Sequence, residues 1–133
     1  MGGSCGCGSK DVMIFACSGA SDAGAITDLA ARHLTLEGKG KMSCLAQIGA
    51  GNEKVIGSAR GAEAVLVLDG CPVDCAKQML EKAGVSSFKH LRVTDHGLRK
   101  GLSPANAENV SAIVGIAHGL LPSKLNEAGG CCG

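Results

Sequence analysis

The stretch AEAVLVLDGCPVDCAKQMLEKAG, residues 62–84, decides the fold. Its first half is an unbroken apolar run that ends at Asp69, which is typical of a strand buried on both faces in the centre of a parallel sheet. Its second half has a helical pattern and ends in Gly84, a residue suited to a left-handed helix cap. The cysteines Cys71 and Cys75 therefore lie where a strand gives way to a helix, the place at which open α/β sheets bind ligands.

Three other parts of the chain have the same order of strand and helix. The apolar runs predict strands at 12–19, 41–49 and 88–97, and the helical patterns predict helices at 20–38, 52–62 and 103–122. The first of these helices would stop at Gly38, and the last would have Ser103 as its cap and Pro104 at its first position. This alternation predicts a single-domain α/β fold, with a Rossmann-like open parallel sheet of about four strands flanked by helices.

Composition narrows the class of protein. The chain has 133 residues, enough for one domain with its own core, and 45% of them are hydrophobic while only 2% are aromatic. The net charge is +1 and the charged residues are scattered, with no run of Lys and Arg. A nucleic-acid surface needs clustered basic residues or stacking aromatics, so we expect no nucleic-acid partner.

The cysteine content points to metal or thiol chemistry. No segment resembles a secretory signal or a membrane span, so we expect a cytoplasmic protein without a membrane partner. Thiols stay reduced in the cytoplasm, and the eight cysteines are therefore expected to be metal ligands or reactive groups. A secreted disulfide scaffold is the alternative, and the missing signal disfavours it. Residues 1–10 and 127–133 are rich in Gly and Cys and are expected to be flexible tails around a domain at 11–126.

The spacing of the inner cysteines brings them to one edge of the sheet. Cys17, Cys44 and Cys71 are separated by 27 and again by 27 residues, about one strand and one helix. They should therefore occupy similar positions near the carboxyl ends of successive strands, and those ends share one edge. With Cys75 they make four thiols, the number that a closed zinc site uses.

The residues after the central strand predict how its helix begins. With Cys71 as N-cap, Pro72 takes the first helical position, where its missing N–H costs nothing. Asp74 then lies in the first turn, and Cys75 faces the same side as Cys71. The positive end of a helix lowers the pKa of a nearby thiol toward the thiolate, which binds metals or attacks electrophiles.

Three other side chains are candidates for a supporting role. Asp69 is placed to hydrogen-bond nearby backbone or the outer shell of a ligand. Asp95 and His96 lie at the expected tip of the fourth strand, where His96 could be a ligand, a proton shuttle or a hydrogen-bond partner, or simply a solvated loop residue. The remaining histidines, His33, His90 and His118, are expected to be ordinary helix or strand residues.

The motifs ACSGASDAG, GKMSCLAQIG and LDGCPVDCAKQMLEKAG resemble those of the DGC-domain proteins of prokaryotes, which are described as zinc-binding and named for their Asp-Gly-Cys motif. The resemblance covers about residues 12–126. It implies that Cys17, Cys44, Cys71 and Cys75 chelate the metal. It implies no defined reaction, and it says nothing firm about Cys5, Cys7, Cys131 and Cys132.

Two classes of function remain open at this point. The first is a zinc-binding protein with a four-cysteine site, acting in metal or sulfur handling, if necessary with a protein partner that gives or takes the cargo. The second is a thiol-based redox or sulfur-carrier protein without a metal, or an iron–sulfur protein that uses the same cysteines, with Cys5, Cys7, Cys131 and Cys132 as accessory thiols. No Ser-His-Asp or paired-carboxylate set can be named, so we favour binding over catalysis. The Gly-rich turns lack the full nucleotide-binding patterns.

Overall fold

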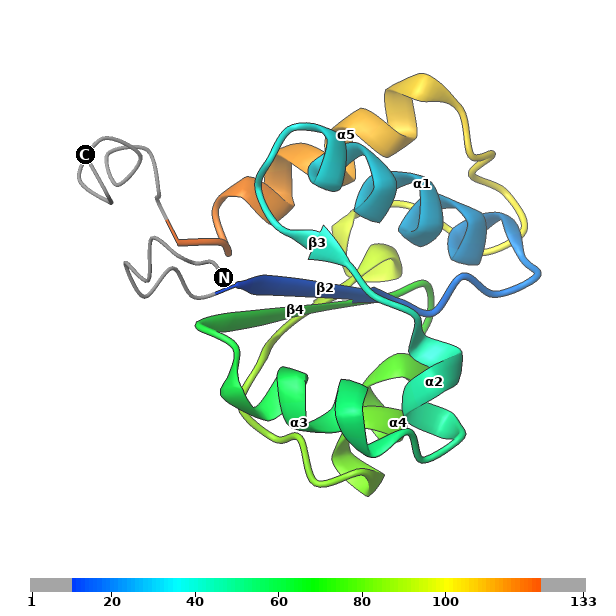
Figure 1. Ribbon diagram of the computed structural model, residues 1–133. Coiled ribbons are helices and arrows are strands. Elements are labelled where there is room, and N and C mark those ends of the chain that lie inside the picture. Colours follow the sequence, from blue (N-terminus) through cyan, green and yellow to red (C-terminus); the bar gives the residue numbers. More distant parts are fainter. Residues whose placement is uncertain (1–10, 123–133) are drawn as a thin grey trace, which may run out of the picture.

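The computed structural model describes residues 11–122, which form one open sheet with helices on both faces (Figure 1). The four strands are all parallel and lie in the order β3-β2-β4-β5. In chain order the elements are β2 (Val12–Ala16), α1 (Asp22–Leu36), β3 (Lys41–Met42), α2 (Leu45–Gly49), α3 (Glu53–Gly61), β4 (Ala64–Asp69), α4 (Cys75–Lys82), β5 (Lys89–Arg92), the 3₁₀ helix η1 (Val93–His96) and α5 (Ala107–His118). The predicted fold class is confirmed.

Strands β2 and β4 form the centre of the sheet. All of β2 and nearly all of β4 are buried, as their continuous apolar sequences require. Ala16 pairs with Leu68 in the register, so the two strands end at the same level. The chain passes from β2 outward to β3 and then returns to β4 on the other side of β2. The strand order therefore reverses between β2 and β4, and ligands of open α/β sheets bind at such a point.

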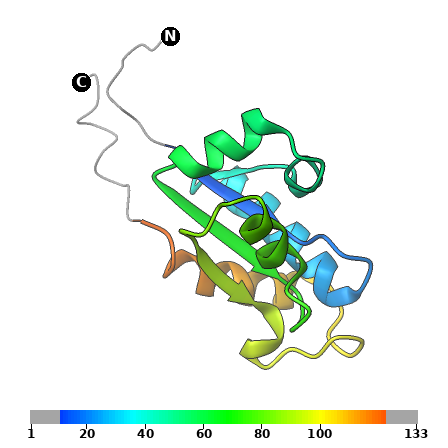
Figure 2. The same cartoon turned by 90° about the horizontal axis from the view of Figure 1, so that it is seen from below.

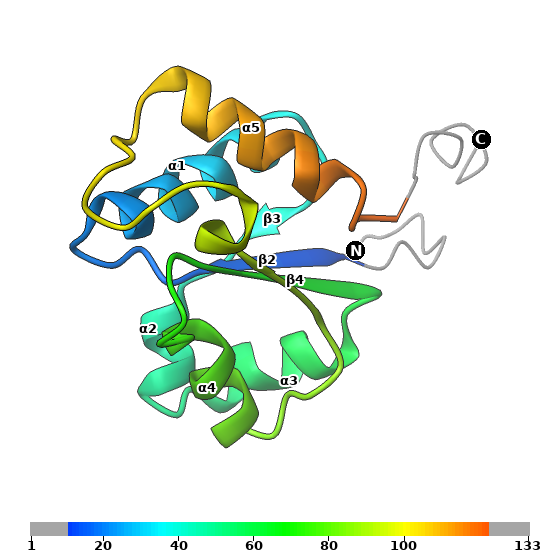
Figure 3. The same cartoon turned by 180° about the vertical axis from the view of Figure 1, so that it is seen from behind.

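The core consists of two apolar layers, one on each face of the sheet. Helices α1 and α5 cover one face, and α2, α3 and α4 cover the other, an arrangement that Figures 1 and 3 show from opposite sides. Figure 2 looks onto the face that carries α3 and α4. Side chains of β2 alternate between the layers, with Ile14 in the α1–α5 layer and Phe15 in the other. Both layers are filled mainly by aliphatic residues, as the composition predicts.

Two predicted strands are shorter than expected. The strand predicted at 41–49 is only β3, because the chain leaves the sheet after Ser43, whose N–H donates to the Ile14 carbonyl. Residues 45–49 form the short helix α2, and Cys44 is its N-cap. The strand predicted at 88–97 ends at Arg92 and continues as η1, which Gly97 closes with a φ of 83°. Short apolar runs do not distinguish strand from helix by periodicity, which explains both errors.

Two helix starts also differ from the prediction. Helix α4 begins at Cys75 and not at Pro72, and its N-cap position is held by Asp74 and not by Cys71, because Asp74 has a left-handed φ of 56° and separates the helix from the preceding turn. Helix α5 begins at Ala107 with Asn106 as its cap. The hydroxyl of Ser103, the predicted cap, instead accepts the N–H of Arg99. The helix ends agree better with the sequence, since Gly38 and Gly84 both adopt the expected positive φ.

The predicted tails lie outside the described residues, and so do Cys5, Cys7, Cys131 and Cys132. The structure therefore says nothing about the accessory thiols. Within residues 11–122, no helix combines the length and the apolar character that crossing a membrane requires.

Candidate functional site

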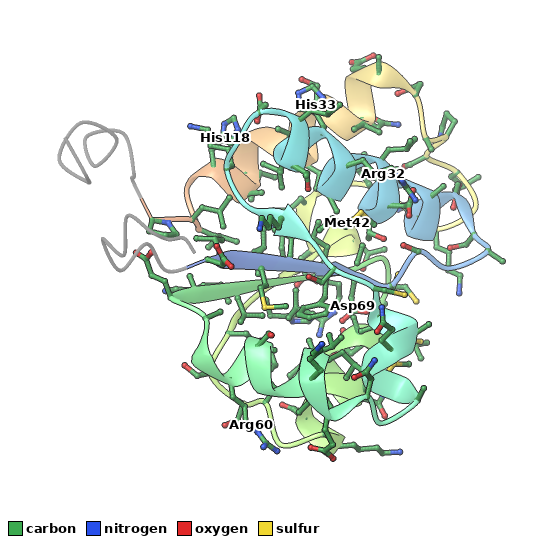
Figure 4. The ribbon with its side chains drawn as sticks, in the orientation of Figure 1. Arg32, His33, Met42, Arg60, Asp69 and His118 are labelled. Atoms are coloured by element: carbon green, nitrogen blue, oxygen red, sulfur yellow. The ribbon has the colours of Figure 1, made fainter. Side chains whose placement is uncertain are left out.

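A cleft of about 580 Å³ lies at the carboxyl edge of the sheet, where β2 and β4 end. Cys17 lines it from the loop after β2, and Cys71 and Cys75 line it from the segment after β4. Its charged lining consists of Lys100, from the loop before α5, and of Asp69 and Asp74. Figure 4 labels Asp69, which ends β4 beside this cleft. We refer to this site as the cysteine cleft.

The two loops that form the cysteine cleft pack backbone against backbone. A Cβ atom on Gly24 would lie 2.5 Å from the backbone N and O of Gly19. A Cβ atom on Gly70 would lie 2.9 Å from backbone atoms of Ala23 and Gly24. Only glycine fits at either position, so Gly24 and Gly70 of the sequence motifs are needed for this close approach.

Cys17 is held by the first turns of α1. Its Sγ lies 3.5 Å from Oγ1 of Thr27, a buried hydroxyl that donates to the Gly24 carbonyl. Ser18 follows with a left-handed φ of 52°, its N–H donating to Thr27 Oγ1 and its hydroxyl donating to Asp28. The conformation after Cys17 is thus fixed by hydrogen bonds to α1.

Ser18 and Asp74 are the two non-glycine residues with positive φ within residues 11–122. Ser18 directly follows Cys17, and Asp74 directly precedes Cys75. Such conformations are unfavourable for residues with a Cβ atom and persist where surrounding contacts impose them. Their placement next to two cysteines of one cleft indicates that the structure fixes the directions of these thiols.

Asp69 takes over the capping role that Asp74 does not fill. The Asp74 side chain makes no capping hydrogen bond to α4. Instead the buried carboxylate of Asp69 accepts the N–H groups of Ala76 at 2.8 Å and of Lys77 at 3.0 Å. A carboxylate suits this place because the first N–H groups of a helix lack partners and carry positive partial charge. The last residue of β4 therefore sets the position of α4 and of Cys75.

Two side chains of β5 stabilise the same turn through polar contacts. His90 Nε2 lies 2.9 Å from Asp69 Oδ2, and Arg92 donates two hydrogen bonds to the Asp74 carboxylate, from Nε at 2.8 Å and from Nη2 at 2.6 Å. Arg92 also pairs with Asp95 at 3.0 Å. His90 is a strand residue, as the sequence analysis expects, and the structure adds its contact with Asp69. The sequence gives little indication of this contact, because only the strand order of the sheet places β5 beside β4.

Asp69, Asp74 and His90 have ligand-type atoms within 4.8 Å of one another, a separation that would suit a metal ion. Their atoms are already engaged, however. Both oxygens of Asp69 accept backbone N–H groups, and both oxygens of Asp74 accept from Arg92. A metal would have to displace these bonds, so we assign this group to the support of α4. We call these three residues together with Arg92 the paired cluster.

Cys75 differs electrostatically from what the sequence predicts. Although Cys75 is exposed as a residue, partial desolvation raises the pKa of its thiol, and the nearby Asp69, Cys17 and Cys71 raise it further. The helix N-terminus does not offset this increase, because the lowering contribution of the Cys75 backbone N–H is the smallest and the Asp69 carboxylate accepts the next N–H groups of α4. Its surroundings thus disfavour the ionisation of Cys75, an effect that a bound cation would reverse.

Lys100 is a residue of the cleft that the sequence analysis missed. Its Nζ donates to Cys71 Sγ at 3.7 Å. The loop that carries it is tied to the start of α1, since Asp22 accepts the N–H groups of Gly101 at 2.7 Å and of Ser103 at 3.2 Å. The Gly101 bond is the main reason why the pKa of Asp22 lies below its usual value. No sequence motif marks Lys100, because its position depends on this long-range contact.

Cys44 does not lie in the cysteine cleft. It is exposed and lines a neighbouring cleft of about 570 Å³ together with Arg32, Leu36 and Met42. Figure 4 labels Arg32 and Met42 on the α1 side of the sheet. The structure therefore brings together three of the four predicted ligands. Among the described residues, no three cysteine sulfurs all lie within 4.8 Å of one another.

Asp95 and His96 also lie apart from the cysteine cleft. Both are exposed on η1, and the contact of Asp95 is with Arg92. His96 is the last residue of η1. Of the predicted supporting residues, Asp69 alone lines the cleft.

Comparison with known proteins places the chain in a family. The model of the DGC domain matches residues 13–116. The chain is also 34% identical over 88 residues to the anaerobic and virulence modulator AnvM of Pseudomonas aeruginosa, an overlap of 66% of this chain and 67% of AnvM. No solved structure gives a significant match. The motifs that the sequence analysis singled out thus coincide with a recognised domain, and the chain belongs to the DGC-domain family.

Proposed function

We propose that this protein binds a zinc ion through Cys17, Cys71 and Cys75 and acts in the handling of metal or sulfur. The observation that carries the proposal is the convergence of these three cysteines on one cleft from two different strand ends. Thiolate sulfur is a preferred donor for zinc, and three protein ligands with an open position are typical of sites at which the metal reacts or is exchanged.

The donor type of the cleft suits such a metal, and binding would require the three sulfurs to move closer together, because they do not all lie within 4.8 Å of one another here. The raised pKa of Cys75, caused by partial desolvation and by the nearby Asp69, Cys17 and Cys71, is the expected state of crowded thiols without a cation. A divalent ion would relieve this repulsion, and binding would release thiol protons. Cys44, the fourth predicted ligand, lies in the neighbouring cleft, and its participation remains a prediction.

The architecture favours a metal that the protein carries as cargo, rather than a metal that holds the fold together. Two aliphatic layers stabilise the sheet on both faces without the cysteines, apart from Cys17, which packs at the border of one layer. A domain with such a core does not need a metal to fold, unlike small zinc modules.

Metal analysis of protein purified without oxygen tests the proposal. We expect about one zinc per chain in the wild type, and a sharp loss of zinc in Cys71→Ser and Cys75→Ser. Cys131→Ser, outside the described residues, is the matched control and should keep its zinc. Equal zinc content in the wild type and in Cys71→Ser would contradict the assignment.

The contact between Lys100 and Cys71 supports a second candidate function, a sulfur carrier or thiol redox protein that uses Cys71 without a metal. An ammonium beside a sulfur atom suits an anionic sulfur species. The same preparation separates the candidates. Metal-free protein with all thiols reactive would favour the second function, and brown protein with iron and labile sulfide would favour an iron–sulfur site.

A further inference from the structure

The cysteine cleft is much larger than a metal ion needs. Its volume of about 580 Å³ falls within the range of about 300–1,000 Å³ that small organic ligands occupy. The cysteines come from the two strand-end segments, and Lys100 enters from a separate loop. The space that remains is therefore bordered by sulfur donors, by one cation and by the carboxylates of Asp69 and Asp74, whose oxygens already accept hydrogen bonds from α4 and from Arg92.

We infer that this space binds the thiolate of a small organic thiol as an additional ligand of the metal, and that Lys100 is the residue that selects it. The inference rests on the proposed function, because the metal is needed to hold the sulfur. A thiolate matches the soft character of a three-cysteine site, and its negative charge matches the ammonium. An organic thiol, rather than sulfide, matches the volume.

Lys100 is the cation available for this role. Of the described residues that line the cysteine cleft, it is the one with a basic side chain. The other basic side chains nearby have partners of their own, since Arg92 pairs with Asp74 and His90 contacts Asp69. Asp22 anchors the loop of Lys100 through the Gly101 N–H. The ammonium is thus held at the cleft even though the side chain is exposed to water.

Charge explains why a lysine is useful here. A divalent ion with three thiolates carries a net negative charge, and a further thiolate increases it. The Lys100 ammonium, 3.7 Å from Cys71 Sγ, offsets part of that charge. Cys44, which would otherwise supply the additional thiolate, lies in the neighbouring cleft. An incoming thiol is also the chemical means by which zinc passes from one set of cysteines to another.

Cobalt(II) in place of zinc gives a direct readout, because each cobalt–thiolate bond adds charge-transfer absorption. Cobalt-loaded full-length protein is titrated with L-cysteine, with sodium sulfide and with L-serine as the control lacking a thiol. We expect L-cysteine to increase the absorption with saturation in the wild type and equally in Cys44→Ser, and L-serine to have no effect. Saturation by sulfide but not by L-cysteine would overturn the choice of an organic ligand.

Variants of Lys100 test the selection. Lys100→Gln should weaken L-cysteine binding about fivefold, the effect of one unit charge at roughly 4 Å in water. Lys100→Arg should retain the wild-type affinity, and so should Lys82→Gln at the other end of α4. Unchanged affinity in Lys100→Gln would overturn the role of Lys100. Because Lys100 is exposed, these variants should fold, and thermal melting checks this.

The outcomes also separate this inference from the proposed function. If the wild type binds no stoichiometric cobalt, the proposed function fails. If cobalt binds with a spectrum that L-cysteine does not change and that loses absorption in Cys44→Ser, then Cys44 fills the position. The proposed function stands in that case, and the inference about an external thiol is overturned.

Discussion

The paired cluster and the three cysteines of the cleft are built around the same turn, and Asp69 and Asp74 line the cleft as well, yet the two groups differ in how their polar atoms are bonded. In the paired cluster, Asp69 accepts two backbone N–H groups and faces His90, and Asp74 accepts two bonds from Arg92. In the cysteine cleft, Cys17 and Cys71 make single contacts at 3.5 Å and 3.7 Å. The polar atoms of the paired cluster are hydrogen-bonded to one another and to the backbone, whereas the sulfur atoms of the cysteine cleft stay accessible to a ligand.

This difference indicates that the paired cluster stabilises the turn, whereas the cysteines are available for binding. Buried charges are stable in a protein when every lone pair has a partner, and breaking one such contact leaves another charge unsatisfied. A thiol sulfur without a strong hydrogen bond costs the folded state little free energy, so it can remain available for a ligand. We therefore expect the paired cluster to determine stability and the cysteine cleft to determine metal binding, and three further experiments test this separation.

The largest effect is expected for Asp69→Ala. This change leaves two N–H groups of α4 and the His90 ring without their partner in a buried place, and we expect the free energy of unfolding to fall by about 3 kcal/mol. Urea denaturation of the metal-free protein measures it. Asp95→Ala is the control, because that carboxylate is exposed, and it should change stability by less than about 0.5 kcal/mol. Similar losses in both variants would contradict the special role of Asp69.

A smaller effect, visible in acid, is expected for Asp74→Asn, which keeps the turn because asparagine tolerates a left-handed φ. The Arg92 hydrogen bonds hold the pKa of Asp74 below its usual value of 3.8, although partial burial acts in the opposite direction. The native pKa is therefore the lower one. The stabilisation by this group is complete above the unfolded pKa and is lost as the pH falls through the native pKa.

Asp74→Asn should remove this part of the acid dependence. At pH 7 we expect it to cost less than about 1 kcal/mol, since the ion pair is partly in contact with water. Urea denaturation at several pH values between 6 and the acid limit of folding, roughly the range over which carboxylates titrate, gives the comparison. An unchanged slope of stability against pH would show that the Arg92 pair contributes nothing to acid stability.

The smallest effect on stability is expected for Cys75→Ser in the metal-free protein. Its side chain is exposed, so the free energy of unfolding should change by no more than about 0.5 kcal/mol. Metal content should nevertheless fall sharply, as stated above. Thermal melting and metal analysis of the same preparation measure both quantities. A loss of stability as large as that of Asp69→Ala would mean that the two groups are not separate.

The sequence was informative about the fold where its signals were long. The continuous apolar runs of β2 and β4 predicted central parallel strands, and the positions of Gly38 and Gly84 predicted helix ends. It failed at the short elements, where β3 is followed at once by α2 and where β5 passes into η1. A run of a few apolar residues has no periodicity to separate strand from helix, and neighbouring contacts decide.

For the candidate site, the sequence by itself determined the cysteines and their edge, because equal spacing in repeated strand–helix units places residues at equivalent strand ends. Only the tertiary structure decided that Cys17, Cys71 and Cys75 share a cleft while Cys44 lies in the next one. It also decided that His90 and Lys100 approach the same turn from β5 and from the last loop. The physical reason is that strand order and loop anchoring, such as the bonds to Asp22, arise from long-range packing. Such packing leaves no local pattern in the chain.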